Sequence, residues 1–384
     1  MDDLIKSPVG RMDNMLIATV LALSGIGVIM IFSASSAVAF EKFGSSHAFL
    51  TKHFLRIVLG IVGMLIIARI DYKKYQDYVV LLLIFSLILL ILVPFVGLKI
   101  KGASRWFSIF GFSFMPSELA KFVLVIYFAD FLSRKGALVR DIKKGFGTAL
   151  GVVGLFAFLI FLQPDFSTAA VIGLIIFTML YMGGAKITHF LALAAVVIPT
   201  GIAAVFTSAY RKQRVMNFIA SDFENMSYQM KQAYIGLGSG GISGVGIGES
   251  KQKLMFLPEQ YTDFIFAILG EELGLIGEFL VILLFLIFLA RGLRTAKRSP
   301  DSFGQFLAAG ITVAVVIYAF LNISVVTGLV PTTGLPLPFI SYGGTSVVLT
   351  LWSVGILLNI SRQGNALELQ NLTEREFENE NVET

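Results

Sequence analysis

Four carboxylates lie in or beside one apolar stretch, FLPEQYTDFIFAILGEELG, which covers residues 256–274. They belong to Glu259, Asp263, Glu271 and Glu272. Ionisable groups in a membrane-spanning segment are costly and are functional candidates by default. Asp263 stands where the apolar helix begins. A carboxylate there can cap the helix N-terminus, or it can act as a general base on a bound hydroxyl group.

Helical spacing separates these carboxylates into different roles. One helix face carries Asp263, Ala267, Gly270, Glu271 and Gly274. Small residues allow close helix approach, so this face is expected to point into protein, with Asp263 at the membrane surface. Glu271 lies about 12 Å deeper along the helix and is expected to be a buried structural acid. Glu272 points elsewhere and has no visible partner.

A second candidate group lies in MPSELAK, residues 115–121. Pro116 suits the first turn of a helix, which places Glu118 and Lys121 three residues apart on one face. Two interpretations remain open. The two side chains either form a local ion pair, or the helix N-terminus and Lys121 bind phosphate together with Arg105 of KGASRWF.

Asp165 of QPDFST lies in a predicted connection between two spans. It either forms a turn or joins Glu118 and Asp263 in an acidic cluster. Oxygen ligands of this kind suit Mg²⁺ or Mn²⁺, so Glu118 and Asp165 are the candidate metal ligands. Glu259, Thr262 and Ser341 lie in the same set of polar segments and complete the candidate substrate-binding residues, with Arg105, Glu118, Lys121 and Asp165.

The amino-acid composition indicates that these residues belong to a membrane protein. Of 384 residues, 56% are apolar and 14% are charged, whereas soluble domains carry about 25% charged residues. The mean hydropathy is +0.82. The chain has no cysteine, which excludes disulfides and thiolate chemistry, and its three histidines show no metal-ligand spacing, which argues against a histidine metal centre. The net charge of +5 is typical of basic inner loops rather than of nucleic-acid binding.

The hydropathy pattern predicts an all-α integral membrane protein with ten transmembrane helices. The expected spans are about 14–39, 54–70, 78–97, 117–133, 146–163, 168–184, 188–208, 263–291, 303–329 and 343–361. Residues 1–362 form one polytopic domain with a long extracytoplasmic loop, about 209–261, between the seventh and eighth spans. Residues 363–384 are expected to be an acidic, disordered cytoplasmic tail. No segment resembles a cleaved signal peptide.

The distribution of charge predicts the orientation. Inner segments are rich in Lys and Arg when both termini are cytoplasmic, as in the cluster Arg134, Lys135, Arg140, Lys143 and Lys144. All the polar interruptions then fall on the outer face, including PEQYTDF at 258–264, PTTGLPLPFISYGGTS at 331–346 and the glycine-rich GLGSGGISGVGIGES. The last contains a G-x-G-x-x-G match without the strand and helix of a dinucleotide site, and is interpreted as a lid.

Together these segments resemble the SEDS family of bacterial cell-wall proteins over residues 14–362. The resemblance rests on GASRWF, PSELAK, QPDFSTA, the run from SYQMKQAYIG to GEELGLIG, and GLVPTTGLPLPFISYGGTS. Within the family the sequence is more similar to the FtsW and SpoVE branches, of division and sporulation, than to the RodA branch of elongation. Tyr261-Thr262-Asp263 departs from the frequent His-Thr-Asp.

The resemblance implies a peptidoglycan glycosyltransferase that polymerises lipid II at the outer face of the bacterial cytoplasmic membrane. It implies that Asp263 is the essential acid, that Arg105, Glu118 and Lys121 are site residues, and that a class B penicillin-binding transpeptidase and divisome proteins are partners. Two alternatives remain open: a lipid II flippase, which needs a charged path to the inner leaflet, and a noncatalytic scaffold for the transpeptidase.

Overall fold

The computed structural model describes residues 10–100, 103–109, 112–207, 209–219 and 226–383. Its first half contains α1 (Asn14–Phe43), α2 (Ala48–Ile67), α3 (Lys73–Asp77), α4 (Val79–Val96), β1 (Leu98–Ile100), β2 (Ala103–Ile109), β3 (Phe112–Phe114), α5 (Pro116–Lys135) and α6 (Gly147–Leu162). Its second half contains α7 (Phe166–Met182), α8 (Ile187–Phe206), α9 (Ala209–Ile219), α10 (Tyr228–Gly240), α11 (Ile265–Lys297), α12 (Ser302–Val326) and α13 (Thr345–Glu383).

The bundle is that of a helical membrane protein. Within the described ranges, seven helical segments are long and apolar enough to cross a bilayer; they lie in α1, α2, α4, α6, α11, α12 and α13. The other three predicted spans coincide with α5, α7 and α8. α5 carries several charged side chains, and α7 has only 17 residues. The seven confirm the helical membrane class, whereas the total of ten spans stays a prediction.

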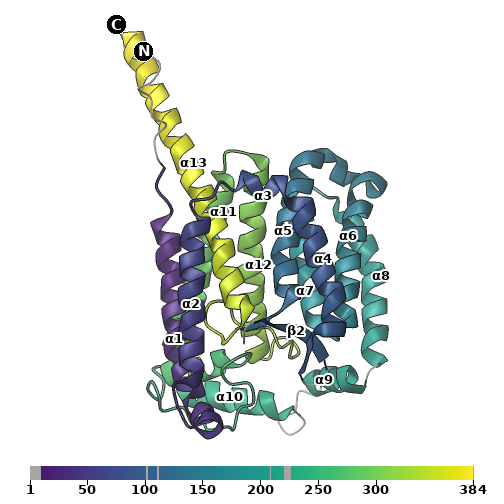
Figure 1. Cartoon of the computed structure of the whole chain (residues 1–384), viewed down its shortest axis with the longest axis vertical. Helices are drawn as coiled ribbons and strands as arrows, with labels where there is room; N and C mark the ends of the chain where they lie inside the picture. Colours follow the sequence, from purple (N-terminus) through teal and green to yellow (C-terminus); the bar gives the residue numbers. More distant parts are fainter. Residues whose placement is uncertain (1–9, 101–102, 110–111, 208, 220–225, 384) are drawn as a thin grey trace.

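α1 begins and α13 ends toward the same end of the bundle, and α9 and α10 lie at the opposite end (Figure 1). Within the predicted outer loop 209–261, the structure forms α9 and α10, and residues 220–225 lie outside the described residues. The candidate residues of 258–264 and 331–346 meet at this second end. We call it the outer end, after the orientation that the charge distribution predicts.

A small antiparallel sheet at the outer end was not predicted. Its strands follow the order β1-β2-β3, with Leu98 opposite Trp106 and Phe107 opposite Phe114. The all-α prediction is therefore wrong for this connection. Two of the strands have only three residues, too few for an alternating pattern to be recognised in sequence.

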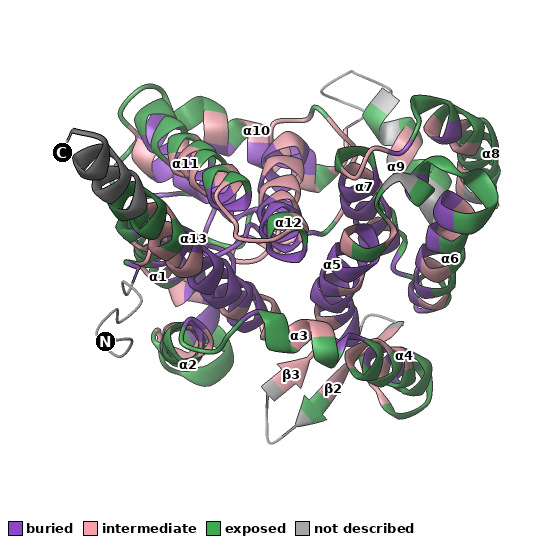
Figure 2. Ribbon diagram, turned by 90° about the horizontal axis from the view of Figure 1, so that it is seen from above, coloured by how far each residue is buried: buried purple, intermediate pink, exposed green. Residues whose placement is uncertain are grey.

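Burial separates a protein core from a lipid-facing surface. α5 and α12 are buried along most of their length and lie near the centre of the bundle (Figure 2). α2, α4 and α8 present large apolar side chains outward, among them Leu59, Phe95 and Val196. Hydrocarbon solvates such faces, whereas water would not.

α11 is broken at Gly274, where φ is 63° and ψ is −166°. The break leaves backbone groups without helical partners, and the glycine-rich segment 241–246 binds them. The amides of Val245 and Gly246 donate to the carbonyls of Glu271 and Glu272, and the amides of Leu275 and Ile276 donate to the carbonyls of Gly241 and Ile242, at 3.0–3.2 Å. The segment predicted as a lid therefore fills a helix break, which satisfies the backbone away from water.

The C-terminal tail also differs from its prediction. α13 continues as one helix to Glu383, beyond the bundle and past the predicted end of the last span (Figure 1). Beyond Gly364 the tail contains no glycine or proline and is rich in Glu and Leu, which favour helix. Arg298 at the end of α11 also forms an ion pair of 2.5 Å with Glu368.

The break in α11 yields a direct test of its packing. A Cβ at position 274 would lie 2.3 Å from the amide nitrogen of Gly244 and 2.6 Å from the carbonyl oxygen of Ile242. Gly274→Ala should therefore reduce the free energy of unfolding by at least about 2 kcal/mol, visible as a lower thermal midpoint in detergent. Gly154→Ala in α6, where no atom lies within 4 Å, should be neutral or stabilising. Equal midpoints for the two variants would contradict this packing.

Candidate active site

Asp263 is partly exposed and lies in the turn that leads into α11. The residue at the helix cap is Phe264, and no side chain caps the helix. The capping interpretation of Asp263 is therefore wrong. A Cβ added at Gly334 would lie 3.4 Å from Asp263 Oδ2, which places the carboxylate against the PTTGLP segment.

Two irregular segments hold Asp263 by pairing with each other. The amide of Tyr342 donates to the carbonyl of Tyr261 at 2.8 Å, and the hydroxyl of Ser341 donates to the carbonyl of Thr262 at 2.6 Å. Ser341 also accepts from the amide of Leu337 at 2.8 Å and is fully buried. The geometry therefore gives Ser341 a backbone-holding role rather than the predicted substrate contact. We call residues 259–264 and 334–342 the paired segments.

Asn322 of α12 joins the paired segments to the bundle. Its side-chain nitrogen donates to the carbonyl of Asp263 at 2.8 Å and to the carbonyl of Leu335 at 2.7 Å. Asn322 is 1% exposed, so both bonds are shielded from water. Sequence reasoning missed it, although a polar amide inside an apolar span was a usable signal.

Thr262 and Glu259 contact each other beside Asp263. The Thr262 hydroxyl lies 3.0 Å from Glu259 Oε2 and 3.1 Å from the Glu259 carbonyl, and both residues are partly exposed. Glu259 has φ of 57°, in the left-handed region that non-glycine residues seldom adopt. These two candidates therefore lie on the accessible side of the site.

Glu118 and Lys121 form a buried ion pair on α5. Lys121 Nζ lies 2.8 Å from Glu118 Oε2, and each residue is less than 5% exposed. The ammonium also lies 3.9 Å from the ring centroid of Tyr318 on α12. The prediction that Glu118 and Lys121 share a helix face is thus confirmed. In this structure the Lys121 ammonium contacts both Glu118 and Tyr318.

Arg105 of β2 binds the turn between α6 and α7. Its Nε donates to the carbonyl of Gln163 at 2.9 Å, its Nη2 donates to the carbonyl of Pro164, and its Nη1 lies 4.0 Å from Asp165 Oδ1. Asp165 also caps α7 by accepting from the amide of Thr168. Burial raises the pKa of the Asp165 carboxyl, the nearby Arg105 charge opposes this rise, and the Glu118 charge adds to it. Arg105 and Asp165 therefore lie together at this turn, whereas the acidic cluster of Asp165 with Glu118 and Asp263 stays a prediction.

α12 connects this charged group to Asp263. The ring of Tyr318 contacts the Lys121 ammonium, and the side-chain nitrogen of Asn322 donates to the carbonyl of Asp263. Residues four apart share a helix face, with Cβ atoms roughly 6 Å apart. The Asp263 backbone and the Lys121 ammonium thus contact α12 at positions one helical turn apart.

Glu118 and Asp165, the candidate metal ligands, do not form a metal-binding arrangement in this structure. In the ranges that the structure describes, no group of three or more Asp, Glu, His or Cys side chains is close enough to hold an ion. Glu118 is paired with Lys121, and Asp165 with Arg105. The described residues therefore offer no preformed ligand set for Mg²⁺ or Mn²⁺, and the binding of either ion stays a prediction.

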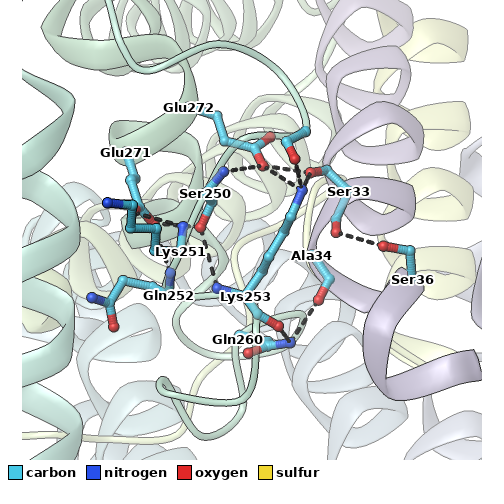
Figure 3. A network of polar contacts seen from close by, with 11 residues as sticks. Ser33, Ala34, Ser36, Ser250, Lys251, Gln252, Lys253, Gln260, Glu271 and Glu272 are labelled. Atoms are coloured by element: carbon cyan, nitrogen blue, oxygen red, sulfur yellow. Dashed lines mark hydrogen bonds and ion pairs between the residues drawn. The ribbon is translucent and has the colours of Figure 1, made fainter. Parts of the chain in front are cut away.

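Glu271 and Glu272 have structural roles (Figure 3). Glu271 accepts from the hydroxyl of Ser250 and from the amides of Lys251 and Gln252. Glu272 pairs with Lys253 at 3.3 Å and accepts from Ser33 of α1. The prediction that Glu271 is a structural acid is confirmed. The prediction that Glu272 has no partner is wrong, because Lys253 of the preceding loop and Ser33 of α1 both contact its carboxylate.

Comparisons with known proteins show the family of this chain. The family model described as Cell cycle protein, FtsW/RodA/SpoVE, matches residues 13–366. The "Probable peptidoglycan glycosyltransferase FtsW" of Geobacter metallireducens is 41% identical over 91% of this chain and 95% of its own. "Stage V sporulation protein E" of Bacillus subtilis is 40% identical over 91% of this chain and 97% of its own.

Solved structures show the same fold. The rod shape determining protein RodA of Thermus thermophilus superposes with a TM-score of 0.68 at 25% identity, over 91% of this chain and 97% of its own. A chain from a peptidoglycan synthase complex that coordinates polymerization and crosslinking superposes with a TM-score of 0.76 at 24% identity, over 92% and 98% of the two chains.

The Lys253–Glu272 pair can be tested by removing one charge. Lys253→Met leaves the buried Glu272 carboxylate without its cation, so it should reduce the free energy of unfolding by about 3 kcal/mol. Lys251→Met is the matched control, because Lys251 is exposed and contributes its backbone amide to Glu271. Thermal midpoints in detergent measure both. If the two substitutions cost the same, the buried pair does not anchor the loop.

Proposed function

Because the chain belongs to the FtsW/RodA/SpoVE family of cell cycle proteins, we propose that it is a peptidoglycan glycosyltransferase that polymerises lipid II, with Asp263 as general base. The names of its relatives and its helical membrane fold support this activity. The observation that carries the catalytic assignment is the partly exposed Asp263 carboxylate, which lies against the PTTGLP segment, while Asn322 holds the Asp263 backbone to α12.

The residues support a direct transfer. Asp263 accepts the proton of the acceptor sugar's 4-hydroxyl as that oxygen bonds to the donor's anomeric carbon. The bond from this carbon to the diphosphate breaks, and the leaving diphosphate takes the electron pair. Arg105 and Lys121 stabilise its charge electrostatically. Lys121 does so from beside Glu118 and Tyr318, and no step here requires a metal ion.

The site and the termini suggest the membrane orientation. α1 begins and α13 ends toward one end of the bundle, and α10, which precedes the loop to Asp263, lies at the other (Figure 1). We place the protein in the bacterial cytoplasmic membrane as a ten-span protein, with both termini inside and the site outside. The basic inner loops support this orientation. The remaining predicted spans are then α5, α7 and α8.

The proposed setting is cell division, with a class B penicillin-binding transpeptidase and divisome proteins as partners. Its support is the similarity to FtsW proteins and the shared fold with a chain from a peptidoglycan synthase complex. The flippase alternative loses support because the deep acids Glu271 and Glu272 bind loop residues rather than standing free.

The test of function compares Asp263→Asn with wild type for polymerisation of lipid II in detergent, each with the cognate transpeptidase present. Loss of the base should reduce the rate about 10²- to 10⁴-fold while lipid II binding persists. Asp77→Asn, an exposed acid near the opposite end, is the matched control. Wild-type polymerisation by Asp263→Asn would overturn the catalytic role. Lipid II transport without polymerisation in the wild type would favour a flippase, and no turnover with intact partner recruitment would favour a scaffold.

A further inference from the structure

Arg56 of α2 brings another cation to the paired segments. It is 7% exposed, and its guanidinium carbon lies 4.9 Å from the ring centroid of Tyr342. Among the described residues, no carboxylate forms an ion pair with it, and its Nη1 has no hydrogen-bond partner. A stacked aromatic face compensates only part of the cost of burying a charge.

The other buried cations near the outer end are neutralised. Lys121 lies 2.8 Å from Glu118, and Lys253 lies 3.3 Å from Glu272. Of these three cations, Arg56 therefore differs in having no carboxylate paired with it among the described residues. A buried guanidinium that lacks a protein anion is arranged to receive an anion from elsewhere.

His53 adds further unused polar atoms beside Arg56. It lies three residues earlier on α2, hence on the same helix face, and is 0% exposed. Neither of its ring nitrogens has a hydrogen-bond partner, and its ring lies 5.9 Å from that of Tyr342. Buried polar groups are normally satisfied, so adjacent unsatisfied groups on two residues point to a missing ligand.

This pair of residues is close to Asp263 through the backbone. Tyr342 is bonded to the carbonyl of Tyr261, two residues before Asp263. The ring of Phe49, also on α2, lies 4.8 Å from Tyr261 and 5.2 Å from Tyr342. The aromatic group thus fixes α2 against the paired segments. Arg105 and Lys121, the other candidate cations, lie on β2 and α5 instead.

We propose that Arg56 and His53, with the ring of Tyr342, form an anion-binding subsite that takes the phosphate groups of a lipid-linked diphosphate. The guanidinium offers several donors in a planar fork that matches phosphate oxygens. The His53 ring offers a further polar contact. The choice of a lipid-linked diphosphate rests on the proposed function, whereas the anion specificity rests on the geometry of α2.

The test measures binding without requiring turnover. Full-length wild type, Arg56→Gln and Arg56→Lys are titrated in detergent with undecaprenyl diphosphate, with undecaprenol as the uncharged probe and with inorganic pyrophosphate as the anion without a lipid tail. Arg69→Gln is the matched control, because Arg69 is an exposed arginine just beyond the other end of α2. Thermal midpoints establish that each variant is folded.

Arg56→Gln should weaken undecaprenyl diphosphate binding about tenfold or more, Arg56→Lys by less, and Arg69→Gln not at all. Undecaprenol binding should not change. Pyrophosphate binding with the same dependence on Arg56 would support the anion subsite and show that the lipid tail is not needed. Unchanged diphosphate binding by folded Arg56→Gln, or equal weakening of undecaprenol, would overturn the subsite.

Failure of this inference is distinguishable from failure of the proposed function. If Asp263→Asn abolishes polymerisation and Arg56→Gln binds like wild type, only the subsite falls. If the protein polymerises no lipid II but Arg56 still governs diphosphate binding, the subsite stands and the activity needs reassignment.

Discussion

One buried amide holds the outer end together. Asn322 gives both of its side-chain N–H groups to carbonyls of two unwound segments, one at Asp263 and the other at Leu335. Irregular backbone inside a membrane bundle must find all its partners within the protein. Because Asn322 is almost wholly buried, its two bonds decide where Asp263 stands relative to α12. The placement of the candidate base against α12 and the segment 334–342 follows from this amide.

The same requirement explains the break in α11. Gly274 opens the helix, and the glycine-rich segment 241–246 satisfies the exposed backbone groups. Loop residues 250–253 then bind the carboxylates of Glu271 and Glu272. The loop that leads to Asp263 is therefore held by α11 at residues 250–253. Asn322 and the segment 334–342 hold the same loop where it enters α11. Pre-organisation of this kind lowers the cost of holding a catalytic group in place.

Much of this architecture could be predicted from sequence. Hydropathy predicted the helical membrane class, and spacing predicted the face shared by Glu118 and Lys121 and the structural role of Glu271. The sequence could not show contacts between residues hundreds of positions apart, such as Ser33 with Glu272. It also could not show the three-residue strands or the helical tail, because short strands carry little pattern and a charged composition alone does not distinguish helix from disorder. Ser341 illustrates the limit, since its residue type suited substrate binding but its hydroxyl holds backbone.

The most direct measurement replaces Asn322 by leucine and compares it with Asn359→Leu. Asn359 is an equally buried amide near the other end, where it donates to the carbonyl of Ala68 and accepts from the amide of Tyr72. Both variants should lose about 1–3 kcal/mol of stability for each unpaired group. At a temperature where both are folded, only Asn322→Leu should lose lipid II polymerisation, by about 10²-fold, because Asp263 is displaced. Equal activity of the two folded variants would contradict the account.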